Sequence, residues 1–388
     1  MIHRLPSTGE ASIVLIPGLS RQLQHHSEIG DSASFSQAKT DTDLEEENDA
    51  IGGSCWQRQG WRLGMVLAFG ISGAIASLPD CASAQVTADT TLGTIVTTPN
   101  GSTFEITGGT LVDGSTLAGT KNLFHSFSSF SIPSEGIGDF LNDPSINNIL
   151  ARVTGGTRSN IQGLIQAGGN ANLFLMNPNG IIFGPGAELN IGGSFVATTA
   201  NAIQFPGGGK FSVNSTVDSG NPLLAINPSA FFFNQIGNQP TPAIEVNNTI
   251  LSVGSQGNPQ SLLLLGGNVT INDATLQGFD GSGSDIQIGG FTGTGSVELS
   301  FDNDNKLRLN LPETGLPTGI VGANISLTNG ARVDVSTATD NAGNILLAGG
   351  TVDLSSGTQL DSSTFGAGDA GQVEIRATES VDLEGEGT

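Results

Sequence analysis

Two apolar runs joined by a four-residue turn place the tightest constraint on how this chain can fold. The turn reads Asn177-Pro178-Asn179-Gly180, and the residues on either side of it are mostly apolar. Pro178 presets φ at the second turn position, Asn177 can close an Asx-turn with its own side chain, and Gly180 tolerates a conformation that a Cβ would penalise. The segment therefore predicts a strand, a tight turn and a second strand.

Similar short runs of alternating apolar residues follow one another from Val86 to Phe205, with Gly, Asn or Pro between them about every eight to twelve residues. Of the 388 residues, 56 are glycine and only 13% are charged, which is far from the composition of an ordinary globular domain. The hydrophobic fraction of 37% is too high for a disordered chain. Stacked short strands joined by tight turns are therefore the predicted class of structure.

An exception is expected between Gly136 and Leu150. Pro144 and several asparagines interrupt this segment, so it is predicted to be an irregular loop followed by a strand. A long helical period is found nowhere between Val86 and Phe205.

The second half of the chain contains a degenerate repeat, in which a short opening precedes a strand-like alternation of apolar and polar residues. The openings are Gly267-Asn268-Val269, Ala323-Asn324-Ile325, Gly343-Asn344-Ile345 and Gly371-Gln372-Val373. Asn324 and Asn344 are 20 residues apart, and Asn344 and Gln372 are 28 apart, which are both lengths of one solenoid coil. One coil cannot bury its apolar face alone, so the repeat predicts a stacked β-helix over residues 251–388.

The charge of the chain argues against nucleic acid as a partner. The formal net charge is −23, and the few Lys and Arg residues after residue 85 are scattered. Binding to a phosphate backbone depends on clustered cations, which this part of the sequence lacks.

An export signal is predicted before residue 85. The apolar run from residue 63 onward is too short to span a bilayer, is preceded by arginines and ends before a small-residue cleavage site. Cleavage after Ala84 would leave Gln85 as the first residue of the mature chain. Residues 63–84 are then the signal peptide, and residues 1–62 are a polar extension expected to be disordered, either part of an extended signal peptide or the product of a start placed too far upstream.

Residues suited to enzymatic or metal chemistry are scarce after the signal. His125 is the only histidine there, both cysteines lie before residue 85, and no His/Cys set has zinc spacing. The acidic turns at Asp280 and Asp302 lack the periodicity of calcium sites. A carbohydrate-cleaving β-helix needs paired carboxylates, and no acidic pair is expected at matching places in consecutive coils. No catalytic, cofactor-binding or metal-binding residue is therefore predicted.

Four segments occur in a fixed order between residues 122 and 200. They are Asn122-Leu123-Phe124-His125-Ser126-Phe127, Arg152-Val153-Thr154-Gly155-Gly156, the Asn-Pro-Asn-Gly turn, and Ile191-Gly192-Gly193-Ser194-Phe195-Val196-Ala197-Thr198-Thr199-Ala200. In this order they resemble the secretion domain of filamentous-haemagglutinin-like exoproteins of two-partner secretion, most nearly the cyanobacterial form. The resemblance implies that residues 85–250 form a two-partner secretion domain. The implied fold is an all-β, right-handed parallel β-helix of the pectin-lyase-like type, with an N-terminal cap and extra-helical hairpins, and residues 251–388 are expected to continue it into a longer protein.

For function, the resemblance implies a secretion signal and scaffold without catalytic activity or cofactor. Domains of this family are recognised in the periplasm by the POTRA domains of a dedicated outer-membrane β-barrel transporter, and they fold at the cell surface. The chain is accordingly expected to be secreted or surface-exposed and to serve adhesion or haemagglutination on a host cell, a neighbouring cell or a polysaccharide. The alternatives are the delivery stalk of a contact-dependent toxin and a β-helical enzyme that binds or cleaves polysaccharide.

The resemblance also points to particular site residues. By position, Asn177, Pro178, Asn179 and Gly180 match the family's Asn-Pro-Asn-Gly motif, which is implicated in secretion and in formation of the fold. Turn chemistry alone also accounts for all four residues, so a purely structural role stays open. The family's second motif, Asn-Pro-Asn-Leu, is missing from this sequence.

Overall fold

The computed structural model describes residues 12–15, 85–114, 119–234, 242–255, 257–279, 283–302 and 305–384. These residues belong to a unit made of residues 1–21 and 84–388. The predicted signal peptide, which ends at Ala84, and nearly all of the N-terminal extension lie outside the described residues. Gln85 is the first described residue after them, and cleavage before it stays a prediction. Within the described ranges, no helix is long and apolar enough to cross a membrane.

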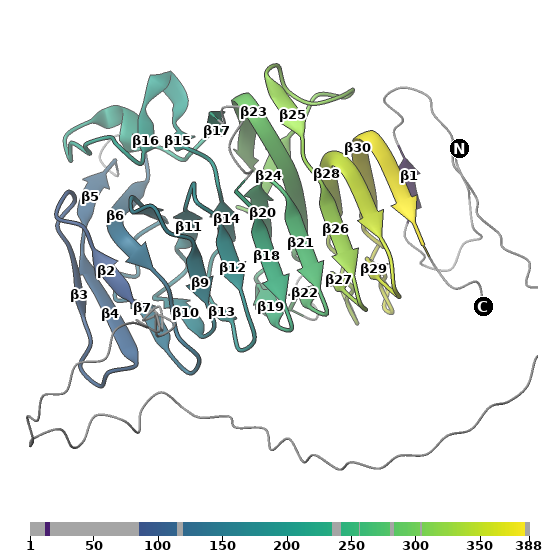
Figure 1. Cartoon of the computed structure of the whole chain (residues 1–388), viewed down its shortest axis with the longest axis horizontal. Helices are drawn as coiled ribbons and strands as arrows, with labels where there is room; N and C mark the ends of the chain where they lie inside the picture. The colour runs from purple at the N-terminus through teal and green to yellow at the C-terminus, as the bar shows by residue number, and fades with distance from the viewer. Residues whose placement is uncertain are drawn as a thin grey trace, which may run out of the picture. The chain divides into compact units, whose positions relative to one another are not determined.

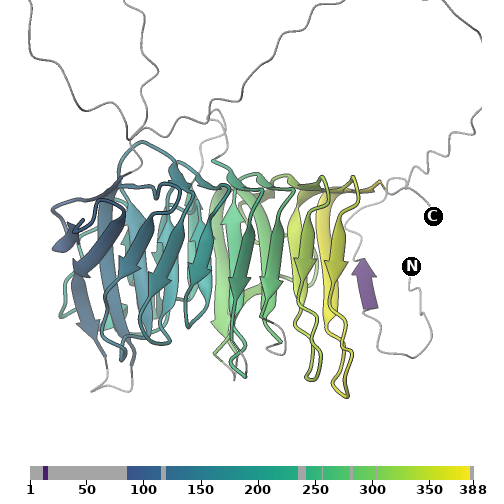
Figure 2. The same ribbon diagram turned by 90° about the horizontal axis from the view of Figure 1, so that it is seen from below.

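Three stacks of parallel strands form the body of the protein, and the chain passes from one stack to the next as it coils (Figure 1 and Figure 2). The first stack contains β6 (Lys121–Phe130), β8 (Asn148–Val153), β11 (Asn172–Met176), β14 (Phe195–Thr198), β20 (Ser261–Gly266), β23 (Asp285–Phe301), β28 (Ile345–Leu354) and β30 (Gln372–Leu383). The second contains β9 (Ser159–Ile161), β12 (Ile181–Phe183), β18 (Ile244–Asn247), β21 (Val269–Asn272), β26 (Ile325–Thr328) and the ends of β28 and β30.

The third stack has two parts. The first part contains β4 (Thr103–Gly108), β7 (Ile137–Phe140), β10 (Leu164–Ala167) and β13 (Glu188–Asn190), and the second contains β19 (Ile250–Val253), β22 (Thr275–Gly278), β27 (Arg332–Asp334) and β29 (Gln359–Asp361). Neighbouring strands within every stack or part pair in parallel. The all-β parallel β-helix predicted from the sequence is therefore confirmed.

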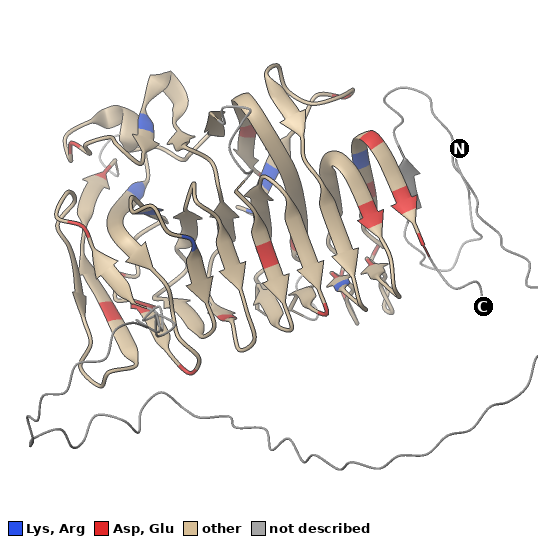
Figure 3. Ribbon diagram, in the orientation of Figure 1, with Lys and Arg blue, Asp and Glu red and all other residues tan. Residues whose placement is uncertain are grey.

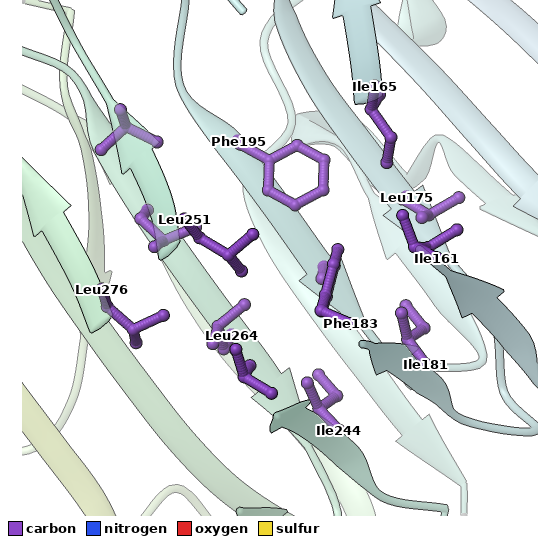
Figure 4. Close-up of a cluster of buried hydrophobic side chains, with 14 of the residues drawn as sticks. Ile161, Ile165, Leu175, Ile181, Phe183, Phe195, Ile244, Leu251, Leu264 and Leu276 are labelled. Atoms are coloured by element: carbon purple, nitrogen blue, oxygen red, sulfur yellow. The ribbon is translucent and has the colours of Figure 1, made fainter. Parts of the chain in front are cut away.

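Apolar side chains at matching positions of neighbouring strands fill the interior of the coils. In the first stack, Leu173 pairs with Ile149 on one side and with Phe195 on the other, and all three are buried. Figure 4 shows Phe183 of the second stack and Leu251 of the third in the same cluster. Paired residues of parallel strands point to the same face, so each coil extends one continuous core, and each such side chain contributes about 1.5–3 kcal/mol.

An N-terminal cap closes the first coil, as the resemblance implied. β2 (Val86–Ala88) and β5 (Thr110–Asp113) pair antiparallel with β6, and β3 (Thr94–Thr97) pairs antiparallel with β4. This pairing satisfies the row of backbone N–H and C=O groups that an open first coil would expose. On the last coil, β1 (Ser12–Leu15) pairs in parallel with β30.

A second, antiparallel sheet lies outside the coils and is built by two excursions of the chain, one between β14 and β18 and one between β23 and β26. Its strands, in order, are β16 (Lys210–Ser212), β15 (Ala202–Gln204), β17 (Ala230–Asn234), the last part of β23, and β24 (Leu307–Asn310). A further strand, β25 (Ile320–Gly322), pairs with the middle of β23, and short 3-10 turns occur at η3 (Pro206–Gly208) and η4 (Pro222–Leu224). The expected extra-helical hairpins are present, and we call their common sheet the outer sheet.

The outer sheet explains why β8, β11 and β20 are buried on both faces. Their outward side chains, such as Phe174 and Leu263, pack with Phe211, Phe231 and Phe233 in a second apolar cluster that is separate from the core of the coils. Simple alternation of apolar and polar residues therefore holds only where the outer sheet does not cover the first stack.

The segment predicted to be irregular between residues 136 and 150 contains a strand. Residues 137–140 form β7, which pairs with β4 and β10, and only the part around Pro144 is a turn. The prediction is wrong for β7 because Gly138 and Asp139 disfavour a strand locally, whereas pairing with neighbouring coils decides the conformation. The strand expected after the turn is confirmed as β8.

The repeat in the second half of the chain is confirmed, but one of its two spacings is not a coil. Ile345 of β28 pairs with Val373 of β30, so the 28-residue spacing from Asn344 to Gln372 is one full coil. Asn324 precedes β26 of the second stack, whereas Asn344 precedes β28 of the first. The prediction of a 20-residue coil is therefore wrong: the spacing measures a step within one coil, because strands of two different stacks open with asparagine.

Candidate functional site

The Asn-Pro-Asn-Gly turn forms a corner of the β-helix. It joins β11 of the first stack to β12 of the second, and each strand pairs with neighbouring coils. The N–H of Gly180 donates to the carbonyl of Asn177 at 3.0 Å and closes the turn. The predicted strand, turn and strand are confirmed, and the turn is a corner between stacks.

Asn177 is fully buried, and hydrogen bonds use both ends of its side chain. Its Nδ2 donates to the carbonyl of Thr157 at 3.1 Å and to Ser159 Oγ at 3.0 Å, while its Oδ1 accepts from N and Nδ2 of Asn179 at 3.0 and 3.1 Å. Its backbone N–H donates to the carbonyl of Thr198 at 2.9 Å. The side chain therefore ties the turn to the preceding coil, and the backbone ties it to the following one.

The remaining turn residues contact the same two coils. Asn179 Nδ2 donates to the carbonyl of Gly155 at 2.7 Å. Gly180 has a φ of 112°, and a Cβ there would lie 2.9 Å from the carbonyl oxygen of Ala243 and 3.0 Å from Arg158 Nε. Glycine alone suits both this conformation and this space. Pro178 and Asn179 are half-buried, so they are the members of the turn that solvent reaches.

The four motif segments found in the sequence lie next to one another in the structure. Residues 122–127 are in β6, residues 152–153 end β8, the turn follows β11, and residues 195–198 form β14. These strands are successive members of the first stack. The order of the motifs along the chain is thus the order of the coils, and each motif is placed about one coil after the previous one.

A ladder of buried asparagines runs along the same coils and was not found from the sequence. Asn148 Nδ2 donates to Asn122 Oδ1 at 2.8 Å, Asn172 Nδ2 donates to Asn148 Oδ1 at 2.9 Å, and the N–H of Ser194 donates to Asn172 Oδ1 at 2.8 Å. Stacked amides satisfy one another's donors and acceptors inside the protein. The usable signal was an asparagine near the start of three strands, at separations of 26 and 24 residues.

The same column continues toward the last coil with other residues. The N–H of Ser261 donates to Ser194 Oγ, the N–H of Asn344 donates to Asp285 Oδ1 at 2.7 Å, and Ser261 pairs with Asp285. Asp285 is buried, and its Oδ2 lies 3.4 Å from Lys306 Nζ and 3.1 Å from Arg308 Nη2. Because a buried carboxylate needs a paired cation, this contact fastens the β24 end of the outer sheet to the column.

Arg152, from the second motif segment, is buried between three parts of the fold. Its Nε donates to Ser126 Oγ in the first coil at 2.8 Å, and its Nη2 donates to Thr91 Oγ1 in the cap at 3.1 Å. Its Nη1 donates to the carbonyls of Ser212 and Ser215 beside the outer sheet, the latter at 2.6 Å. This role cannot be read from the sequence, because the partners of Arg152 lie 26 to 63 residues away along the chain.

Asp89 balances the charge of Arg152 through two hydroxyl groups. Ser126 Oγ and Thr91 Oγ1 accept from Arg152, and each donates to Asp89 at 2.5 Å. Burial would raise the pKa of Asp89, but hydrogen bonds from Ser126, Thr91 and Thr154 outweigh it and hold the pKa below its usual value. Burial lowers the pKa of Arg152, and the charge of Asp89 opposes that change. The group is a hydroxyl-bridged ion pair.

His125 is buried in the first coil among aromatic rings. Its ring lies 5.6 Å from that of Phe140 and 6.1 Å from that of Phe127, and Nδ1 is 3.2 Å from Thr94 Oγ1. Burial lowers the pKa of His125 to about 4. A neutral histidine in this packing agrees with its interpretation as a strand residue.

His125 is expected to make the protein less stable in mild acid. Its pKa is about 6.5 in the unfolded chain and about 4 in the folded one, so between these values the unfolded state binds more protons and stability falls as the pH falls. At pH 5 its contribution to the free energy of unfolding is about 2 kcal/mol smaller than at pH 8. Urea unfolding of wild type and His125→Gln at both pH values measures how much the free energy of unfolding of each protein changes with pH. The two proteins have the same carboxylates, so the carboxylate contributions cancel when the two changes are compared. Equal pH dependence in the two proteins would contradict the prediction.

The prediction that consecutive coils hold no matching acidic residues is wrong. Asp334 pairs with Asp361, and Asp353 pairs with Asp382. The matched positions are 27 and 29 residues apart, so they follow the length of a full coil, which the 20-residue spacing does not give. Asp334 and Asp361 lie 2.7 and 3.5 Å from Arg332 Nη2, and each accepts the backbone N–H of a serine two residues later. These contacts are those of a surface turn repeated in two coils.

Among the residues that the structure describes, no group of three or more His, Cys, Asp or Glu side chains is placed to hold a metal ion. Of the two acidic turns, Asp280 lies outside the described residues. Asp302 accepts the backbone N–H of Lys306 at 2.9 Å and Nε of Arg308 at 3.2 Å, as in a closed polar turn.

Comparison with known proteins gives matches of three kinds. The family model of the TPS secretion domain matches residues 84–347. The heme/hemopexin-binding protein of Haemophilus influenzae is 46% identical over 56 residues, and the match spans only 14% of this chain and 6% of that protein. The HMW1 secretion domain from Haemophilus influenzae has 17% identity and a TM-score of 0.45, over 77% of this chain and 84% of that one. The filamentous hemagglutinin secretion domain has 15% identity and a TM-score of 0.39, over 77% and 99%.

The structure is a β-helical domain with an N-terminal cap and an outer sheet. Its successive coils carry the sequence motifs, and the Asn-Pro-Asn-Gly turn forms one of the corners. The family model covers well over half of the chain, so the chain belongs to the family of TPS secretion domains. It is therefore the two-partner secretion domain of an exoprotein, with a secreted or surface location. The family resemblance seen in the sequence is confirmed, while the cyanobacterial type stays a prediction.

Proposed function

We propose that this chain is the secretion signal and β-helical scaffold of a surface or released exoprotein, recognised in the periplasm by the POTRA domains of a dedicated outer-membrane transporter. The observation that carries the proposal is the burial of the motif turn, residues 177–180. Asn177 and Gly180 are buried in the folded protein, and the polar groups of Asn177 are used within the fold. Pro178 and Asn179 stay half-buried in the fold, but Asn177 and Gly180, and with them the complete motif, are accessible to a partner only while the chain is unfolded.

Such burial makes recognition and folding mutually exclusive. An extended chain can add a strand to the edge of a receptor sheet through main-chain hydrogen bonds, with alternate side chains giving selectivity. A transporter that binds the unfolded turn loses its ligand when the coil closes outside the cell. Folding then favours release in the outward direction without nucleotide hydrolysis.

Once folded, the coils serve as a scaffold. Charged residues are sparse over most of the coils (Figure 3), and a solenoid offers long repetitive faces for contact with a surface. We propose that the activity of the exoprotein is adhesion or haemagglutination, with a host cell, a neighbouring cell or a polysaccharide as the target. Delivery of a contact-dependent toxin is the alternative, and it uses the same secretion domain.

Transporter-dependent release of the full chain tests the proposal. The chain is expressed in a Gram-negative host with and without its cognate transporter, and the protease-resistant fraction in the medium is measured. We expect release only with the transporter. Equal release in both strains, or periplasmic retention in both, would overturn the proposed function.

Two matched proline variants separate recognition from folding. Pro178→Ala changes the motif turn, and Pro185→Ala changes an exposed turn later in the same coil. Each should cost only about 1 kcal/mol of stability, so both proteins still fold. We expect Pro178→Ala alone to weaken binding of the urea-unfolded chain to isolated POTRA domains and to reduce release. Equal behaviour of the two variants would assign the turn a structural role only.

A further inference from the structure

Polar groups of the early coils are completed by a segment that comes much later in the chain. Asn122 Nδ2 donates to the carbonyls of Leu224 and Ile226 at 2.8 and 2.7 Å, across 102 and 104 residues. Asn148 Nδ2 donates to Asn227 Oδ1 at 3.0 Å, across 79 residues. Asn122 and Asn148, the first two members of the asparagine ladder, therefore lack these hydrogen-bond acceptors until this segment is in place.

Arg152 depends on the same segment. The carbonyls that Nη1 contacts, those of Ser212 and Ser215, come 60 and 63 residues after it, and the guanidinium lies 5.0 Å from the centroid of the Phe211 ring. The other partners, Ser126 and Thr91, precede it. A buried guanidinium without partners is strongly unfavourable, so the coil that holds Arg152 cannot bury it fully before residues 211–215 arrive.

The apolar side chains on the outward face of the same coils follow this pattern. The ring of Phe124 lies 5.0 Å from that of Phe211 and 6.1 Å from that of Phe205, and the ring of Phe174 lies 6.4 Å from that of Phe231. Without residues 205–231, these rings would face water along the first stack.

We propose that residues 205–231 act as a folding latch for the N-terminal cap and the first three coils, and that Arg152 is the positioning residue at its centre. Arg152 holds this position because it contacts the cap, the first coil and the latch at once. The early coils stay open while they lead the chain outward, and they close together with the latch once residues 205–231 have emerged. The order of emergence rests on the proposed function, whereas the contacts belong to the folded protein itself.

Hydrogen exchange of the full chain, measured by mass spectrometry for wild type and Arg152→Met, tests the latch. Methionine keeps an apolar stem in place of the arginine stem but removes every donor. We expect about tenfold faster exchange in the cap, in the first three coils (β6, β8 and β11) and in residues 205–231 together, with wild-type rates in β26 to β30. The control is Arg158→Met, because Arg158 is 40% exposed and pairs with Glu245 at the surface, and it should change all rates by less than about twofold.

Two results would overturn the latch. Uniformly faster exchange over the whole β-helix would show that Arg152 contributes general stability only. Unchanged exchange in residues 205–231 would show that this segment closes independently of Arg152. If Arg152→Met does not fold, Asn227→Ala weakens the latch from its own side and should expose the same three segments. None of these measurements uses a transporter, so failure of the latch leaves the proposed function standing, and failure of transporter-dependent release leaves the latch standing.

Discussion

Asn177→Ala is expected to lower the free energy of unfolding by about 4 kcal/mol and to abolish protease-resistant release. The substitution leaves the carbonyl of Thr157, the hydroxyl of Ser159 and the backbone N–H of Asn179 without their partners. The four hydrogen bonds that the Asn177 side chain makes contribute about 1 kcal/mol each. Urea unfolding measures the loss of stability, and protease treatment of the medium measures release.

Two further asparagine variants make the result specific to this corner. Asn177→Asp keeps acceptors for Asn179 but removes both donors and adds a buried charge, so it should be at least as destabilising as alanine. Asn324→Ala changes an exposed asparagine at another coil corner and should shift stability by less than about 0.5 kcal/mol. Similar losses at Asn177 and Asn324 would mean that the buried hydrogen bonds do not determine the effect.

The fold class could be predicted because its cause is local in the sequence. Alternating residues such as Val373 and Ile375 point into the core, and glycine and asparagine mark the corners between strands. Assignment of strands to stacks could not be predicted in the same way. A strand as short as β7 is determined by pairing with the coils above and below it, and the 20-residue spacing joined two stacks that look alike in sequence.

In the candidate site, too, local features could be predicted from the sequence and long-range contacts could not. The motif turn could be found because each of its four residues has turn chemistry of its own. The asparagine ladder and the environment of Arg152 could not be found, because they consist of contacts between residues 22 to 104 positions apart. Phe174 illustrates the same limit: the sequence shows an apolar residue on an outward face, and only the outer sheet shows what covers it.

Two adjacent glycines of the second motif segment are expected to respond very differently to the same substitution. A Cβ at Gly155 would lie 2.0 Å from the carbonyl oxygen of Ser128 in the preceding coil, whereas nothing lies within 4 Å of a Cβ at Gly156. Gly155→Ala must separate two backbones that are in contact, and it is expected to lower the free energy of unfolding by about 3 kcal/mol. Gly156→Ala meets no such obstacle and should change it by less than about 1 kcal/mol.

The Gly155 variant also reaches the motif turn. The carbonyl of Gly155 accepts the hydrogen bond from Asn179 Nδ2, so moving this backbone away from Ser128 loosens the turn as well. Urea unfolding of both alanine variants measures stability, and hydrogen exchange at β11 and β12 reports on the corner between them. We expect faster exchange there in Gly155→Ala and wild-type rates in Gly156→Ala. Equal stability of the two variants would show that the preceding coil gives way at Ser128, and that close contact between the coils does not require glycine at this position.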